Sequence, residues 1–124
     1  SNICTNSGLC ALAFTIHMTL LGSAGLKHLA ELNHANACLL ADMLAKVPGV
    51  QVVTSAFFNE FTVRLPRPAA EVVDKLEKRG ILGGVPASRL LPDAELGDCL
   101  IVCSTEVNTD ADRAAFVAAL KEVL

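Results

Sequence analysis

The stretch from residue 58 to residue 78, FNEFTVRLPRPAAEVVDKLEK, places a strand directly before a helix. Residues 58–65 alternate loosely between apolar and polar side chains and include β-branched and aromatic types, which is typical of a half-buried strand. Pro66 ends this strand, and Pro68 suits the first turn of a helix. The helix carries valine and leucine on one face and acid–base pairs at i,i+4 spacing on the other, so it is predicted to be amphipathic.

Two helices and a short strand are predicted before this stretch. The first helix covers about residues 8–21 and is apolar on nearly every face. Gly22 and its polar or glycine neighbours break the pattern, and a second helix follows over about residues 24–46. A Val-Pro-Gly sequence ends the second helix, and residues 50–53 then form a short strand.

Two further strands are predicted after the stretch 58–78. Residues 81–85 form a short strand that Gly83 and Gly84 weaken, which indicates either a bulge or a close backbone approach to a partner. Residues 88–97 form a loop. Residues 99–104 are largely apolar with β-branched side chains at the centre, which favours a buried strand.

The last helix opens at Asn108 or Thr109. Thr109 and Asp112 approximate a capping box, and acids suit the positive end of the helix dipole. One apolar stripe at helical spacing predicts the face that enters the core: Ala115, Phe116, Ala119, Leu120 and Val123.

The order helix, helix, strand, strand, helix, strand, strand, helix predicts an α+β fold with a small, mostly antiparallel sheet and helices on one side. At 124 residues, residues 1–124 fall within the usual size of one domain. Within it we expect residues 1–23 to be an interface loop and linking helix, and residues 24–124 to be the small α+β domain.

The first helix predicts an exposed apolar patch, because a chain of 124 residues rarely encloses a whole helix. Its charge-free stretch is shorter than a membrane span needs, and no basic residue precedes it as in a signal peptide. We therefore expect no membrane partner. Because the chain starts with a serine and a polar loop, we expect it to be part of a longer polypeptide that covers this helix.

Composition argues against a nucleic-acid binder. The net charge is -3, and the chain has no Trp and no Tyr with which to stack bases. Five cysteines make an odd count in apolar surroundings, so free thiols and a cytoplasmic location are expected. His28 and His34 lie six residues apart on different helix faces, and no metal site is predicted.

Five strings along the chain resemble the glycine decarboxylase P-protein family, in particular subunit 1 of its two-subunit bacterial form. Together they are spread over essentially the whole chain: SNICTNSGLCAL at 1–12, ELNHAN at 31–36, FFNEF at 57–61, GILGGVP at 80–86 and TEVNT at 105–109.

The resemblance implies the C-terminal small domain of a fold-type-I pyridoxal-phosphate enzyme. It also implies a role in decarboxylating glycine and passing the aminomethyl group to the lipoyl H-protein, with pyridoxal phosphate as the electron sink. The implied partners are the large domain of the same subunit, the H-protein, and subunit 2, which bears the cofactor-binding lysine. The chain's own lysines sit in ordinary helical surroundings, so no catalytic residue, no bound cofactor and no activity are expected of this chain alone.

The resemblance also implies interface roles for a few residues. Asn2 and Thr5 would lie near the partner's cofactor phosphate. Asn59 and Glu60 interrupt an apolar run, where a substrate-pocket or interface role competes with a strand edge or cap. Thr105, Glu106 and Asn108 follow a buried strand, where the small domain of such an enzyme often faces the active-site cleft, although helix capping alone accounts for Asn108 and Thr109.

Two alternatives to this function remain open. The chain could be an autonomous small α+β ligand-binding or regulatory domain, with the two adjacent glycines near its ligand. It could also be the small domain of another fold-type-I enzyme, such as an aminotransferase or a cysteine desulfurase. The first helix discriminates, because an autonomous domain should bury it by itself or by dimerisation, whereas a piece of a longer polypeptide should leave its apolar face open.

Overall fold

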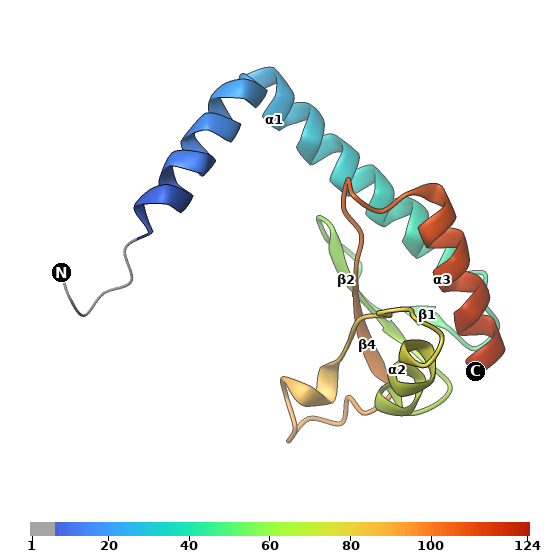
Figure 1. Cartoon of the computed structure of the whole chain (residues 1–124). Coiled ribbons are helices and arrows are strands. Elements are labelled where there is room, and N and C mark those ends of the chain that lie inside the picture. Colours follow the sequence, from blue (N-terminus) through green and yellow to red (C-terminus); the bar gives the residue numbers. More distant parts are fainter. Residues whose placement is uncertain (1–6) are drawn as a thin grey trace, which may run out of the picture. The chain divides into compact units, whose positions relative to one another are not determined.

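The computed structural model describes residues 7–124, which form two compact units, one that ends at Glu31 and one from Leu32 to Leu124 (Figure 1). The elements in chain order are α1 (Gly8–Leu44), β1 (Gln51–Val52), β2 (Glu60–Arg64), α2 (Ala69–Glu77), β3 (Val85–Pro86), a 3-10 turn η1 (Ala87–Arg89), β4 (Cys99–Cys103) and α3 (Asp110–Val123). The functional division predicted at residues 23 and 24 stays a prediction.

The two helices predicted near the N-terminus are both present, and they meet at a kink within the element α1. Gly22 departs from the helical conformation, with φ 61° and ψ -176°, and the residues before and after it are helical. Glycine tolerates this backbone without a steric penalty, and no proline follows that would stop the helix. The glycine signal was therefore read correctly as a break, but it marks a kink and not a loop.

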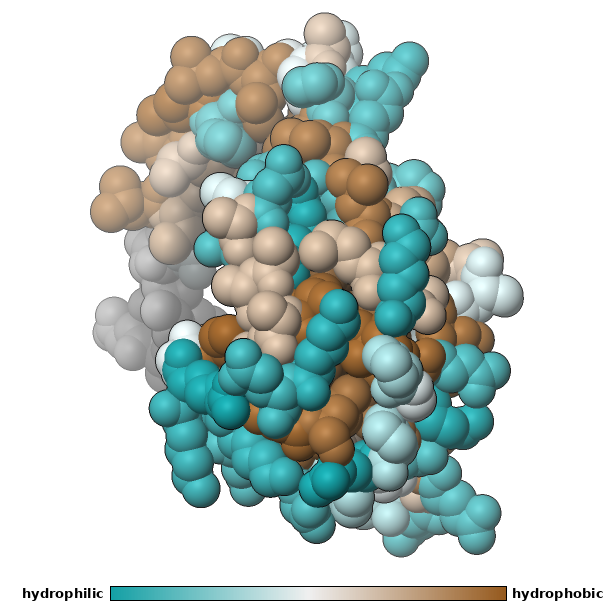
Figure 2. Space-filling model, turned by 90° about the vertical axis from the view of Figure 1, so that its right-hand side faces the viewer, coloured by the Kyte–Doolittle hydropathy of each residue, from teal (hydrophilic) through white to brown (hydrophobic). Residues whose placement is uncertain are grey.

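The predicted apolar patch on the first unit is confirmed. No residue from Ser7 to Glu31 is buried, and Leu9 and Leu20 are each 80% exposed. The brown surface at the upper left of Figure 2 belongs to this part of α1. Taken across the kink at Gly22, α1 is long and apolar enough to cross a membrane, by length and composition alone. The core helix of a soluble protein and a signal sequence pass the same test, so this is weak evidence.

The sheet has the order β1-β2-β4-β3, and every neighbouring pair is antiparallel. The long pair is β2 with β4, in which Phe61 lies opposite Val102 and Val63 lies opposite Leu100. These four side chains are buried, whereas Glu60 and Cys103, one position further along, are exposed on the other face. The edge strands β1 and β3 have only two residues each.

One core joins the sheet to the helices of the second unit. The inward side chains of β2 and β4 pack in one cluster with residues from the end of α1, from α2 and from α3, including Leu44, Leu76 and Leu120, each 0% exposed. Figure 1 shows α2 and α3 beside these strands. The α+β architecture with helices on one face of an antiparallel sheet is thus confirmed.

The capping box predicted at the start of α3 is also confirmed. The Thr109 hydroxyl accepts a hydrogen bond from the Asp112 backbone N–H at 3.2 Å, and the Asp112 carboxylate accepts one from the Thr109 backbone N–H at 2.8 Å. The stripe that enters the core differs at one position from the predicted one. Ala115 is exposed, and Val117 is buried in its place, because the buried face of α3 is turned slightly.

The segment predicted as a strand at 81–85 is strand only from Val85 onward. A side chain on Gly83 would collide with Leu76, and one on Gly84, where φ is +126°, would collide with the carbonyl oxygen of Ile101. The two glycines therefore allow a close backbone approach to the chain's own α2 and β4. The alternative of an approach to a partner is not needed to explain them.

Candidate functional site

Three strings that lie far apart in the sequence meet at one end of the sheet. The β2–β4 register sets Glu60 opposite Cys103, and just beyond it the Ser104 backbone N–H donates to the Asn59 carbonyl at 3.0 Å. From α1, Asn36 donates through Nδ2 to the Thr105 carbonyl at 2.9 Å. We call this region, formed by His34, Asn36, Phe58, Asn59, Ser104 and Thr105, the sheet corner.

His34 of α1 contacts Phe58, on the side of the sheet corner that precedes β2. Its Nδ1 lies 2.8 Å from the Phe58 carbonyl oxygen, and its ring stacks on the Phe58 ring with 6.3 Å between centroids. Cys38, one turn along α1, lies within 3.6 Å of His34 Nε2. His28 and His17 are exposed elsewhere on α1, and the residues from 7 to 124 contain no group of three potential metal ligands.

The predicted site residues within the described range gather near this corner with different exposures. Asn59 and Thr105 are half-buried and are engaged through backbone atoms, whereas Glu60 and Glu106 are exposed. The Thr105 backbone N–H also donates to Asn108 Oδ1 at 2.8 Å, so Asn108 orders the turn and Thr109 caps the helix. Asn2 and Thr5 lie outside the described residues.

The thiols at the two ends of β4, Cys103 beside the sheet corner and Cys99 at the opposite end, show no sign of activation. Partial burial, followed by the nearby Glu60 carboxylate, raises the pKa of the Cys103 thiol. Burial, followed by hydrogen bonding to Asp98, likewise raises the pKa of Cys99. The four cysteines within residues 7–124 are free, as predicted.

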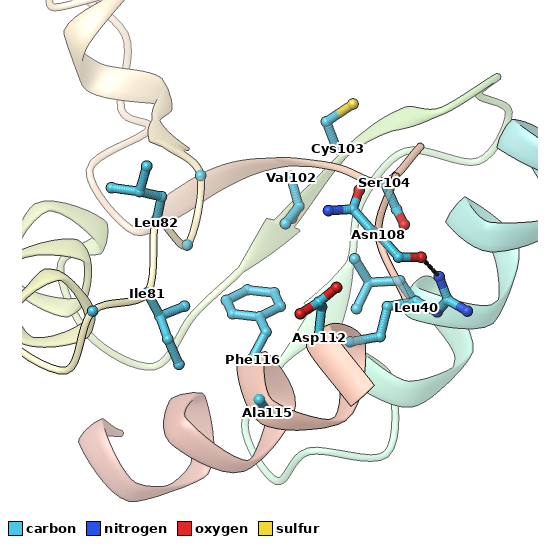
Figure 3. A pocket seen from close by; sticks show the side chains of 14 residues that line it. Leu40, Ile81, Leu82, Val102, Cys103, Ser104, Asn108, Asp112, Ala115 and Phe116 are labelled. Atoms are coloured by element: carbon cyan, nitrogen blue, oxygen red, sulfur yellow. Dashed lines mark hydrogen bonds between the residues drawn. The ribbon is translucent and has the colours of Figure 1, made fainter. Parts of the chain in front are cut away.

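A cavity of about 430 Å³ opens beside the sheet corner, entirely within the second unit. Its walls come from the 80–84 loop, the end of β4 and the first turns of α3. Figure 3 shows Phe116 and Val102 toward its middle, with Ser104, Asn108 and Asp112 around one end. We call it the Ser104 cavity, because the buried Ser104 hydroxyl has no hydrogen-bond partner among the described residues.

Sequence reasoning missed Ser104 and Asp112 as parts of a site. Asp112 was assigned only to the helix cap. For Ser104 a signal existed, because Leu100, Val102 and Ser104 alternate along one strand face and a hydroxyl then occupies a core position. A buried polar side chain in an apolar row is the more informative observation.

The lysines do not fit the anchoring of a pyridoxal-phosphate cofactor. All five lie in the described range, and none lines the Ser104 cavity. Lys27 pairs with Glu31 on the surface, and Lys75 donates to the Val123 carbonyl at 3.4 Å. A lysine that binds a cofactor needs a desolvated pocket, which these positions do not provide.

Comparison with known proteins supports the resemblance to glycine decarboxylase subunit 1 over the whole chain. The chain is 69% identical over 124 residues to the probable glycine dehydrogenase (decarboxylating) subunit 1 of Azorhizobium caulinodans, and 70% identical over 125 residues to that of Parvibaculum lavamentivorans. Each match covers 100% of this chain and 28% of the relative, so the chain spans about a quarter of the length of these relatives.

Solved structures agree on the fold. A crystal structure of glycine decarboxylase (P-protein) of the glycine cleavage system, in inhibitor-bound form, superposes with a TM-score of 0.86 at 36% identity, over 100% of this chain and 28% of that one. A C-DES mutant with glycine covalently linked to its PLP cofactor superposes with a TM-score of 0.68 at 18% identity, over 89% of this chain and 27% of that one. The second likeness shows the fold alone, which is that of a fold-type-I pyridoxal-phosphate enzyme. Residues 1–118 match the family of glycine cleavage system P-proteins, and the chain therefore belongs to that family.

Proposed function

We propose that the chain is the C-terminal small domain of a glycine decarboxylase subunit 1. In the complete enzyme it would support pyridoxal-phosphate-dependent decarboxylation of glycine and transfer of the aminomethyl group to the lipoyl H-protein. The observation that carries this proposal is the match of the entire chain, at 69% identity, to 28% of a relative of that name. The free thiols suit a cytoplasmic location, where cysteines stay reduced.

The exposed apolar side chains of the first unit support a contact with the large domain of the same subunit. Leu9, Phe14 and Leu20 are 80%, 65% and 80% exposed, on a stretch that from Ser7 to Leu26 contains no Asp, Glu, Lys or Arg. Burying one such side chain stabilises a structure by about 1.5 to 3 kcal/mol. The same exposure argues against the autonomous-domain alternative, since an autonomous domain would bury this segment.

The cofactor, in this proposal, is held by subunit 2. When bound there, pyridoxal phosphate supplies the electron sink for decarboxylation. The residues of this chain would shape and close the shared interface: Asn59, Glu60, Thr105 and Glu106 from the sheet corner and its rim, with Asn2 and Thr5 near the cofactor phosphate. The hydrogen bonds of the sheet corner suit this role, because they hold the exposed Glu60 and Glu106 on rigid backbone.

The test is glycine–bicarbonate exchange in the presence of pyridoxal phosphate and H-protein. Subunit 2 is mixed either with full-length subunit 1 or with the 124-residue chain. We expect exchange only with full-length subunit 1. Exchange with the short chain would contradict its inactivity, and no exchange in either mixture would contradict the proposed enzyme.

The interface roles are tested separately in full-length subunit 1. Glu60→Gln and Glu106→Gln should raise the concentration of subunit 2 needed for half-maximal exchange by about 2- to 5-fold, the range expected for exposed charges. Glu95→Gln is the matched control, because Glu95 is an exposed acid on a loop away from the sheet corner. If all three substitutions changed this concentration equally, the assignment of an interface to the sheet corner would be wrong.

A further inference from the structure

The Ser104 cavity has one apolar side and one polar end. Ile81, Val102 and Phe116 contribute the apolar surface, and Ser104, Asn108 and Asp112 surround the polar end (Figure 3). A cavity of about 430 Å³ lies within the usual range of small-molecule sites, which combine apolar walls with a few directed polar groups. None of the predicted interface residues lines it.

The Ser104 hydroxyl is the first indication of a ligand. The side chain is 1% exposed, faces the same side of β4 as Leu100 and Val102, and its Oγ has no hydrogen-bond partner among the described residues. Its backbone N–H is already held by Asn59, so the hydroxyl position is fixed. Leaving a buried hydroxyl unpaired is unfavourable, and an alanine or valine here would avoid the penalty.

Asp112 is the second indication. Its Oδ2 accepts hydrogen bonds from the Thr109 backbone N–H at 2.8 Å and from the Thr109 hydroxyl at 2.7 Å, which leaves Oδ1 available. These hydrogen bonds hold the pKa of Asp112 below its usual value, so the carboxylate is charged at neutral pH. Figure 3 shows this carboxylate between Phe116 and Asn108.

Arg113 also lines the cavity, and its positive charge helps to lower the pKa of Asp112, after the hydrogen bonds from Thr109, but its own hydrogen bonds go to other groups. Arg113 is 6% exposed, and its guanidinium donates to the Asp110 carboxylate and, at 2.6 Å, to the Asn108 carbonyl. Asn108 Oδ1 in turn accepts from the Thr105 backbone N–H, so the polar end is rigid. It offers the second carboxylate oxygen of Asp112 and the Ser104 hydroxyl oxygen as hydrogen-bond acceptors, beside the Asn108 amide, whose Oδ1 is already engaged and whose Nδ2 is a donor.

We propose that the Ser104 cavity binds a small primary ammonium compound with a short branched or cyclic apolar body. The ammonium group donates to Asp112 Oδ1 and to Ser104 Oγ, which satisfies the buried hydroxyl. The apolar body lies against Phe116 and Val102, and the aromatic ring adds a favourable contact for a cation. A carboxylate ligand of the same size is repelled by Asp112.

The test uses isobutylammonium as the probe, titrated into the ¹⁵N-labelled 124-residue chain and followed by backbone amide shifts at pH 7. A primary amine is protonated at this pH. We expect saturable shifts at Ser104, Asn108 and Asp112 with a Kd of about 1 to 10 mM, which is the range for so small a ligand. Isobutanol should bind at least about 5-fold more weakly, and isovalerate should give no saturable shift.

Two substitutions locate the head group. Asp112→Asn should weaken isobutylammonium about 10-fold, because the amide keeps the helix cap but loses the charge. Glu106→Gln, which removes a nearby exposed acid outside the cavity, should leave the Kd unchanged. Ser104→Ala should weaken binding about 3-fold without lowering the unfolding midpoint, which a merely structural hydroxyl would not allow.

The proposal is overturned if isovalerate binds as tightly as isobutylammonium, or if the shifts do not saturate below 100 mM probe, about ten times the upper expected Kd. It is also overturned if Glu106→Gln and Asp112→Asn weaken binding equally. If Asp112→Asn does not fold, the Ser104→Ala result alone decides. The titration needs no second subunit and no pyridoxal phosphate, so its outcome is independent of the proposed function.

Discussion

The two ends of the kinked helix α1 show what burial does for stretches of similar composition. From Gly8 to Glu31 the helix has no buried residue, whereas from Leu32 to Leu44 it buries six, in part against the sheet core. Both ends are rich in leucine and alanine. The composition of a helical segment therefore does not tell whether the segment packs in the core or stays exposed. Only the position of the surface that covers it decides this.

The largest expected difference between these regions concerns leucine. Leu44→Ala should lower the free energy of unfolding by about 2 to 5 kcal/mol, because Leu44 is 0% exposed and a cavity replaces it. Leu20→Ala, on the same helix but 80% exposed, should change it by less than about 0.5 kcal/mol. Urea denaturation followed by circular dichroism measures both. Similar losses for both leucines would mean that the first unit is covered in solution.

Glycine-to-alanine substitutions should also affect the free energy of unfolding differently in the two regions, but by a smaller amount. Gly84→Ala should destabilise the second unit by at least about 2 kcal/mol, because a left-handed conformation costs a non-glycine residue about 1 to 2 kcal/mol and the new methyl group collides with Ile101. At Gly22, where φ is also positive, nothing lies within 4 Å. Gly22→Ala should therefore straighten α1 and leave the unfolding midpoint unchanged. A loss of stability at Gly22 would show that the kink is held by packing.

The threonines provide a third and weaker contrast. Thr109→Ala removes the N-cap of α3 and should cost about 1 kcal/mol in urea denaturation. Thr19→Ala in the exposed part of α1 removes only a hydrogen bond to the Thr15 carbonyl and should be neutral or slightly stabilising, since alanine favours helix. An equal cost at both positions would contradict the role of the capping box.

The smallest effect is a dependence on pH. The pKa of Asp112 is lowered in the folded chain, chiefly by the hydrogen bonds from Thr109. The unfolded chain therefore binds this proton more readily, and the stabilisation is present above the ordinary aspartate pKa and lost as pH falls through the folded value. Denaturation between pH 7 and pH 2.5 should show this loss in the unsubstituted chain and a reduced loss in Asp112→Asn. Asp93→Asn, on an exposed loop, is the control and should behave as the unsubstituted chain.

Local sequence patterns were sufficient to predict most elements of the fold. Alternation predicted β2, and an apolar run with β-branched residues predicted β4. The prolines marked the start of α2, and the Thr109–Asp112 spacing predicted the cap of α3. These features depend on neighbours within a few residues, and the physics that decides them is present in a short window of sequence.

The rest depends on contacts between distant residues. From sequence alone, Gly22 marks a break in the helical pattern but not whether the break is a loop or a kink. Gly83 and Gly84 predicted a bulge or a close approach to a partner, whereas they allow close packing against Leu76 and Ile101 of the same chain. The sheet corner joins Asn36 to Thr105, which lie 69 positions apart, and no local pattern could place them together. The unpaired hydroxyl of Ser104 became visible only once its neighbours were known.

The short edges of the sheet limit how the chain can associate. β1 and β3 each offer two residues for pairing, and Pro86 in β3 has no amide hydrogen to donate. A strand from another molecule would gain very few backbone hydrogen bonds at either edge. Any stable neighbour must therefore recognise side chains on a helix or on the outer sheet face, which gives sequence-specific assembly and resists the indiscriminate stacking that leads to fibres.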